Sequence, residues 1–267
     1  MAQIFETIKA KLLEIEKEEN VRIFYACESG SRAWGFPSVN SDYDVRFLYI
    51  REQNFYLSID VEDKRDVIEV PIDDELDING WDLRKALRLL RKSNPPLLEW
   101  LSSPTVYLEE EELIKKFRSL VPLSYSPTAC MYHYMQMARN SFREYLKGDE
   151  VSVKKYFYVL RPLLAIKWIE ERSDVVPMEF GIMIDALLHD SDLKSQILKL
   201  IERKRKGEEM SREPKIPAIS GFIETEMDRL KDLSIPRRDE KPLMKTLNDA
   251  FREIVNRSAI RDPHSTF

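Results

Sequence analysis

The chain has 267 residues, which suits one large domain or two modest ones, and its 43% hydrophobic content excludes general disorder. Lysine and arginine (42) nearly balance aspartate and glutamate (47), which argues against a polybasic nucleic-acid coat but permits a local basic groove. Two cysteines and three histidines are too few for a disulfide scaffold or a Cys/His zinc cluster. Because neither a membrane-length apolar run nor a secretory signal is evident, we expect a cytoplasmic protein with no membrane partner.

The first part of the chain alternates helical and strand patterns. Apolar residues at helical spacing predict a helix over residues 3–18. Strands are predicted over residues 21–27, 42–50, 67–71 and 76–81. Helical spacing resumes at Leu83 and ends before Pro95, because proline interrupts a helix. This alternation indicates a mixed sheet packed with helices.

From about residue 102 the pattern becomes helical and shows no convincing strand. Helices are predicted over residues 109–120, 128–146, 150–172, 178–200 and 240–257. The charged segment 202–217, which contains the run Arg203-Lys204-Arg205-Lys206, reads as an exposed loop. We therefore expect an α+β protein, with a sheet-bearing domain over residues 1–105 and an all-helical domain over residues 106–267.

The segment between the first two predicted strands carries the most chemical information. Gly30-Ser31 follows a buried strand at a turn, where glycine lets backbone N–H groups approach an anion and the serine hydroxyl can donate to it. Asp42 and Asp44 stand two apart in a strand, so their carboxylates share one face and repel each other unless a cation lies between them. Oxygen ligands suit Mg²⁺. A phosphate-binding turn beside a carboxylate-bound metal is the arrangement that phosphoryl or nucleotidyl transfer requires.

The spacing Gly-Ser, ten residues, Asp-x-Asp resembles the signature of the DNA polymerase β-like nucleotidyltransferase superfamily. The fuller text is similar to its RNA-repair-pathway (RlaP-type) branch, over roughly residues 20–185. The matching blocks are Gly-Ser-Arg-Ala-Trp-Gly-Phe, Ser-Asp-Tyr-Asp-Val-Arg-Phe, Gly-Trp-Asp-Leu-Arg-Lys-Ala-Leu and Arg-Pro-Leu-Leu. The resemblance implies the nucleotidyltransferase fold, an NTP donor and two Mg²⁺ ions, with Mn²⁺ as a substitute.

At the matching positions of this sequence, the resemblance implies that Gly30 and Ser31 bind the β- and γ-phosphates. It implies that Asp42 and Asp44 bind the metal ions. A third carboxylate normally comes from a later strand, and Asp77 is our choice for it. Asp82 competes with Asp77, but it precedes a leucine-periodic helix and is most simply its N-cap. Other aspartates left open for this role are Asp66, Asp73 and Asp74.

Several neighbouring side chains have two interpretations each. Arg46 falls on the face of Asp42 and Asp44, where it either contacts a phosphate or neutralises the carboxylates. Arg32 lies inside the turn, where it is either a phosphate ligand or a solvated loop cation. Trp34 stacks on a base or packs the loop, and the role of Glu28 is left open.

The helical part offers a second set of candidate phosphate ligands, namely Lys154, Lys155, Tyr158 and Arg161. Residues 154, 158 and 161 follow helical spacing and therefore share one face of a helix. If that face lies against the cleft, it could bind a triphosphate. The alternative is an amphipathic helix whose cations are merely solvated. Arg161 is preferred to Lys154 because a planar guanidinium engages two phosphate oxygens at once. Lys204, in the predicted loop, is expected to be a surface cation.

The sequence thus predicts a Mg²⁺-dependent nucleotidyltransferase that moves an NMP from an NTP to an acceptor hydroxyl. An RNA end is the acceptor that the family resemblance implies. Transfer to a protein or to a small molecule such as an antibiotic is the alternative within this class. An alternative from another class is a catalytically silent nucleotide- or RNA-binding protein, although an idle site need not retain a repulsive carboxylate pair.

Overall fold

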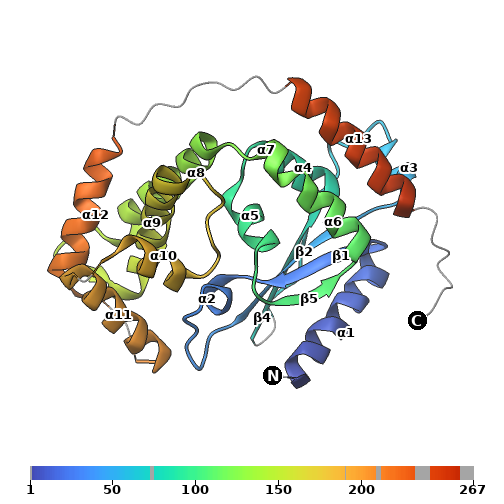
Figure 1. Cartoon of the computed structure of the whole chain (residues 1–267). Coiled ribbons are helices and arrows are strands. Elements are labelled where there is room, and N and C mark those ends of the chain that lie inside the picture. Colours follow the sequence, from blue (N-terminus) through green and yellow to red (C-terminus); the bar gives the residue numbers. More distant parts are fainter. Residues whose placement is uncertain (1, 73–74, 190, 209–211, 232–240, 259–267) are drawn as a thin grey trace.

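The computed structural model describes residues 2–72, 75–189, 191–208, 212–231 and 241–258. A mixed five-stranded sheet forms one side of the molecule and a group of helices forms the other (Figure 1). The predicted α+β class is confirmed. No described helix has both the length and the apolar composition needed to cross a membrane.

The sheet side is built mainly by the first part of the chain. Its elements are, in chain order, α1 (Ala2–Glu19), β1 (Arg22–Glu28), α2 (Gly30–Ala33), β2 (Tyr43–Ile50), α3 (Gln53–Tyr56), β3 (Val67–Glu69), β4 (Leu76–Asp82), α4 (Leu83–Arg91), α5 (Pro95–Leu101), β5 (Val106–Glu109), α6 (Glu111–Ser119) and α7 (Val121–Ser124). The predicted strands over residues 21–27, 42–50, 67–71 and 76–81 are present with small shifts at their ends.

The sheet has the strand order β3-β4-β2-β1-β5. Strands β2 and β4 run parallel, and the other neighbours run antiparallel. The register of the parallel pair sets Asp44 opposite Asp77, so these two aspartates lie on adjacent strands. The topology therefore brings together two carboxylates that are far apart in the sequence.

The two faces of the sheet bury different side chains, as the period-two alternation of a strand requires. Val45, Phe47 and Tyr49 of β2 pack with the apolar stripe of α1. Leu48 and Ile50 point to the opposite face and join the larger core shared with the helices. Asp44 and Arg46 lie on the same face of the strand as Leu48. The first residues of β2 therefore present their polar side chains to the helical side.

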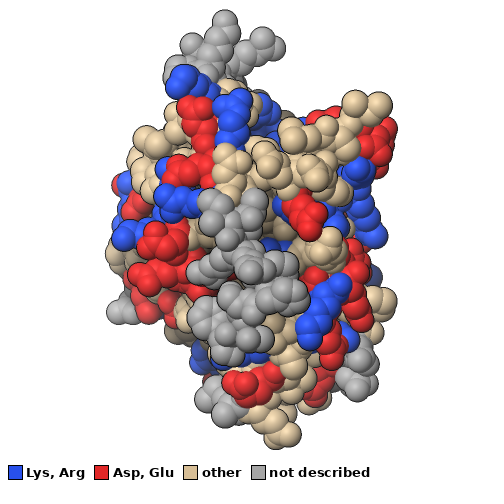
Figure 2. Space-filling view, turned by 90° about the vertical axis from the view of Figure 1, so that its right-hand side faces the viewer, with Lys and Arg blue, Asp and Glu red and all other residues tan. Residues whose placement is uncertain are grey.

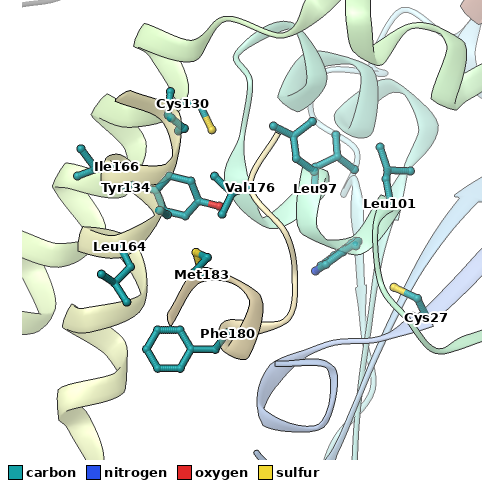
Figure 3. Packing of buried hydrophobic residues seen from close by; sticks show 14 of the residues in the cluster. Cys27, Leu97, Leu101, Cys130, Tyr134, Leu164, Ile166, Val176, Phe180 and Met183 are labelled. Atoms are coloured by element: carbon teal, nitrogen blue, oxygen red, sulfur yellow. The ribbon is translucent and has the colours of Figure 1, made fainter. Parts of the chain in front are cut away.

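The helical side consists of elements from the second part of the chain. They are α8 (Pro127–Tyr145), β6 (Glu150–Ser152), the 3₁₀ helix η1 (Val153–Tyr156), α9 (Phe157–Arg172), α10 (Phe180–Leu187), α11 (Asp192–Arg205), β7 (Arg212–Pro214), α12 (Pro217–Arg229) and α13 (Lys241–Ser258). Helices α8 and α9 pack side by side, and Figure 3 shows Cys130 and Tyr134 of α8 facing Leu97 of α5 across the core, with Phe180 and Met183 of α10 beside them.

Three expectations for this part were wrong. The region after residue 102 contains strands: β5 pairs with β1 in the main sheet, and β6 pairs with β7. The single helix expected over residues 178–200 is two helices, because Ser191 caps a new one by accepting a hydrogen bond from the Lys194 N–H. The segment 202–217, expected to be a loop, contains the last turn of α11 and the strand β7, and it reaches the first residue of α12.

Helix α13 returns to the sheet side of the molecule and lies along α4 and α6 (Figure 1). Its apolar stripe, which includes Leu247 and Ile254, belongs to the large core. Strand β5 lies just past the expected boundary at residue 105, so both β5 and α13 complete the unit begun by residues 1–105. Whether the parts 1–105 and 106–267 fold separately stays a prediction.

Candidate active site

A pocket of about 370 Å³ lies where α2, the start of β2, α9 and α11 meet. The residues predicted from the sequence that line it are Gly30, Ser31, Asp42, Asp44, Arg46, Lys154 and Tyr158. The predicted residues that are not part of its lining are Arg32, Asp77, Lys155 and Arg161. Most of the expected site is thus brought into one cavity between the sheet and the helices.

Glycine is required at position 30 by the carboxylate opposite it. Gly30 has φ of +58°, in the left-handed region, and a Cβ at this position would lie 1.9 Å from Asp44 Oδ2. The preceding residue fixes the approach, because the Ser29 N–H donates to the Asp44 carbonyl at 2.8 Å. The Gly-Ser turn therefore lies directly against the aspartate.

We expect Gly30→Ala to weaken nucleotide binding because its methyl group must displace the Asp44 carboxylate. Gly35→Ala is the matched control: Gly35 also has a positive φ, of +89°, but an added Cβ would meet no atom within 4 Å. Both variants should lose stability by about 1–2 kcal/mol from backbone strain. Calorimetry with an NTP should show weaker binding only in Gly30→Ala. Equal affinities would show that the contact with Asp44 is unimportant.

Arg32 supports the loop that carries Asp42. Its guanidinium donates to the Ser41 carbonyl at 2.6 Å and to the Asp42 carbonyl at 3.1 Å, and it stacks on the Tyr43 ring. A hydroxyl cluster continues this support, since Ser41 Oγ accepts from the Ser38 N–H and lies 3.2 Å from Ser31 Oγ. Arg32 thus positions the main chain around the pocket, and the phosphate contact predicted for it stays a prediction.

Arg46 joins the two aspartates of the parallel strands. One of its nitrogens, Nη2, donates to Asp44 Oδ1 at 3.1 Å and to Asp77 Oδ2 at 2.7 Å. Of the two interpretations left open by the sequence, this geometry is that of a cation neutralising carboxylates. Asp77 is thereby held beside Asp44, although it does not line the pocket.

Burial raises the pKa of Asp44, and the neighbouring Asp77 and Asp42 raise it further while Arg46 opposes them. Glu28, left open by the sequence, lies behind this group: its carboxylate accepts from the Asp44 N–H at 2.8 Å and from the Tyr107 hydroxyl. Burial raises the pKa of Glu28 to about 7. The site is therefore rich in carboxylates that favour a cation.

Lys204 is the residue that sequence reasoning missed. It belongs to the last turn of α11, is only 8% exposed and lines the pocket beside Asp44 and Lys154. Its Nζ lies 4.6 Å from the centre of the Phe36 ring. Burial and the nearby charge of Lys154 lower the pKa of Lys204 to about 8, and Asp44 partly opposes this shift. In the part of the chain that the structure describes, Lys204 has no salt bridge to a carboxylate, so its charge is available to an anion.

The place expected for Arg161 is wrong. The residue is buried, with only 2% of its surface exposed. Its guanidinium donates to Glu99 at 2.6 Å and to the Met178 carbonyl at 3.0 Å, and it lies over the Trp34 ring. This guanidinium is buried, is paired with a carboxylate and is not part of the pocket lining, so it is out of reach of a phosphate bound there. Because Trp34 follows α2, Arg161 instead supports the Gly-Ser turn from behind.

Two further helical candidates are separated by the structure. Tyr158 is 41% exposed at the pocket, with its ring edge-on to Trp34 at 6.1 Å between centroids. Lys155 lies over the rings of Tyr145 and Tyr158, outside the pocket lining. Lys154 and Tyr158 thus face the cavity, whereas Lys155 stabilises the aromatic side of its wall.

The competing aspartates have other partners. Asp82 caps α4 by accepting from the Arg84 N–H at 2.7 Å, and it accepts from the Tyr56 hydroxyl at 2.7 Å, which confirms the N-cap interpretation. Asp66 pairs with Lys85 at 3.0 Å. Asp73 and Asp74 lie outside the described residues.

The donor set of the pocket fits a magnesium ion bound together with a nucleotide. Asp42 and Asp44 present hard oxygen ligands to the cavity. Among the described residues, no three His, Cys, Asp or Glu side chains form a ready metal cage. Mg²⁺ does not require one, because it is usually held by one or two carboxylates, substrate phosphates and water.

The mixed sheet, the glycine turn and the paired aspartates are the features of a polymerase β-like nucleotidyltransferase. The chain belongs to the RNA repair pathway DNA polymerase beta family, whose model matches residues 4–253. The resemblance noted from the motifs is thereby confirmed, over a longer stretch than the motifs indicated.

A curated protein and a solved structure are also similar to this chain. "Uncharacterized protein YcgL" of Bacillus subtilis (strain 168) is 48% identical over 252 residues, which cover 91% of this chain and 96% of the relative. A crystal structure of a nucleotidyltransferase-like protein from Exiguobacterium sibiricum 255-15 matches with 12% identity and a TM-score of 0.31, covering 97% of this chain and 96% of that chain.

Proposed function

We propose that this protein is a Mg²⁺-dependent nucleotidyltransferase that moves an NMP from an NTP to an acceptor hydroxyl and releases pyrophosphate. The observation that carries the proposal is the pocket itself, whose lining brings Asp42 and Asp44 together with the Gly30-Ser31 turn and with Lys154 and Lys204. Groups that can bind an anion and groups that can bind a cation share this one cavity, as a metal–triphosphate complex requires. Membership of the polymerase β family supports the same reaction class.

Each group has a task in this proposal. The Gly30-Ser31 turn binds the β- and γ-phosphates from the sheet side, and Lys154 and Lys204 bind them from the helical side. Asp42 and Asp44 would hold the metal, which when bound stabilises the charge that develops on the transferring phosphoryl group. Arg32 and Glu28 keep these aspartates in place through their main-chain atoms.

The acceptor is proposed to be an RNA end, and this rests on the family description alone. The protein surface offers RNA no large basic field on the face shown in Figure 2, where the described basic and acidic side chains are interspersed. The basic run Arg203-Lys204-Arg205-Lys206 has partners within the fold: Arg203 pairs with Glu213, Arg205 donates to the Gly35 carbonyl and Lys206 pairs with Glu202. We therefore expect the face shown in Figure 2 to bind RNA weakly.

The test is incubation of the protein with each labelled NTP and Mg²⁺, with and without RNA. Label transferred to RNA with release of pyrophosphate supports the proposal. Label on protein, or on an added small-molecule acceptor, would replace the RNA end with the alternative acceptor. Nucleotide binding without any product would instead favour a silent binding protein.

A further inference from the structure

The position of Arg46 bears on how many metal ions the site takes. Two-metal sites hold their ions about 3.5–4 Å apart, bridged by shared carboxylates. Here two of the three carboxylates predicted to hold the metals are already joined by a cation, since Arg46 Nη2 lies 2.7 Å from Asp77 Oδ2 and 3.1 Å from Asp44 Oδ1. Asp77 is also outside the pocket lining, whereas Asp42 and Asp44 are part of it.

The main chain holds the guanidinium in this place independently of the carboxylates. Arg46 Nη1 donates to the Asp77 carbonyl at 2.7 Å and to the Val45 carbonyl at 3.0 Å. Both carbonyls belong to paired strands whose register sets Asp44 opposite Asp77. A divalent ion that displaced the guanidinium would break these bonds. It would leave two main-chain carbonyls without a donor, and the Arg46 side chain, which is only 17% exposed, without its acceptors. Loss of four hydrogen bonds at a largely buried position makes such displacement unfavourable.

We infer that the guanidinium of Arg46 permanently occupies the place of one of the two cations that the superfamily resemblance implies, so that the site binds a single divalent ion at Asp42 and Asp44. This inference rests on the proposed function. It makes Asp77 a partner of Arg46 rather than a metal ligand. The guanidinium supplies one fixed positive charge, half that of a divalent ion, beside the carboxylates of Asp44 and Asp77.

The experiment counts metal ions instead of measuring activity. Mn²⁺ is titrated into the protein with a non-hydrolysable NTP analogue, and free Mn²⁺ is followed by electron paramagnetic resonance against a blank without protein. We expect one ion per chain in the wild type. Two ions in the wild type would overturn the inference and leave the proposed function standing, whereas no bound ion would overturn the proposed function itself.

Variants test the cause of this stoichiometry. In Arg46→Gln, Asp44 and Asp77 lose the cation that joins them, and we expect a second Mn²⁺ ion per chain. Arg65→Gln is the control, because Arg65 is an exposed cation that pairs with Glu69 of β3, away from the pocket. It should bind one ion. The melting transition shows whether Arg46→Gln is folded. One bound ion in the folded variant would show that Arg46 does not limit the number of Mn²⁺ ions. If the variant does not fold, the number of ions bound by the wild type decides.

Discussion

Replacing Asp44 with asparagine (Asp44→Asn) is expected to reduce nucleotidyl transfer by about a thousandfold or more. Removal of a metal-binding carboxylate costs several kcal/mol of transition-state stabilisation, and each 1.36 kcal/mol is a factor of ten in rate. The fold should persist, because asparagine has the same shape and its oxygen can still accept from Arg46. Rates of pyrophosphate release under saturating NTP measure the effect.

The stability of this variant should move in the opposite direction. A pKa that is raised in the folded state means that Asp44 stabilises the protein at low pH, and that this contribution is lost as pH rises through the folded pKa. At neutral pH the charged carboxylate therefore costs stability, which asparagine removes. We expect a melting temperature equal to or above that of the wild type. Asp63→Asn, at an exposed turn, is the control and should change neither the transfer rate nor the melting temperature. A wild-type transfer rate in Asp44→Asn would contradict the assignment of Asp44 to the active site.

Lys204→Met is expected to weaken NTP binding by about 1.5–3 kcal/mol, or roughly 10- to 100-fold, the scale of a lost hydrogen bond to a charged group. Methionine fills nearly the same volume between Phe36 and Phe157 without the charge. Since the lowered pKa of Lys204 means that its charged form destabilises the folded protein below about pH 8, the variant should also melt at a higher temperature. Calorimetry with ATP and with adenosine separates phosphate binding from base binding.

The pH dependence of binding identifies Lys204 independently. Because the pKa of Lys204 is about 8 with Lys154 and Asp44 nearby, wild-type affinity for a triphosphate should fall between about pH 7 and pH 9 as the amine loses its proton. Lys204→Met should lack this dependence. Lys206→Met, next to it but exposed and paired with Glu202, should behave as the wild type. A loss of affinity equal to that of Lys204→Met in this control would reduce Lys204 to an ordinary surface charge.

The sheet and its aspartates could be predicted because their signals are local. Strand β1 is a continuous apolar run that is buried on both faces, and the alternation in β2 places Asp44 and Arg46 on one face. The Gly-Ser turn and the Asp-x-Asp pair are separated by a single loop. Short-range patterns of this kind depend on backbone geometry alone.

The roles of Arg161 and Lys204 depended on distant partners. Arg161 meets Glu99, which is 62 residues away, and helical spacing does not reveal that a cation will be buried. Lys204 stands among four consecutive cations, which resemble a solvated loop. A signal was nevertheless present, since Ile197, Leu200 and Ile201 define the buried stripe of α11 that continues to Lys204.

The missed strand β5 has a similar explanation. Val106–Glu109 is only four residues long, too short for a clear alternation, and its strand geometry comes from pairing with the edge of β1. The break between α10 and α11 had a local signal in the cap at Ser191, which the apolar periodicity on both sides obscured.

The return of α13 to the sheet side sets an order of events during synthesis. Domains tend to fold from the N-terminus as the chain emerges from the ribosome. Part of the apolar surface of α4 and α6 is covered only when Leu247, Ile254 and their neighbours in α13 have been synthesised. The nascent sheet unit therefore exposes this apolar surface to other apolar surfaces while residues 120–240 are being made.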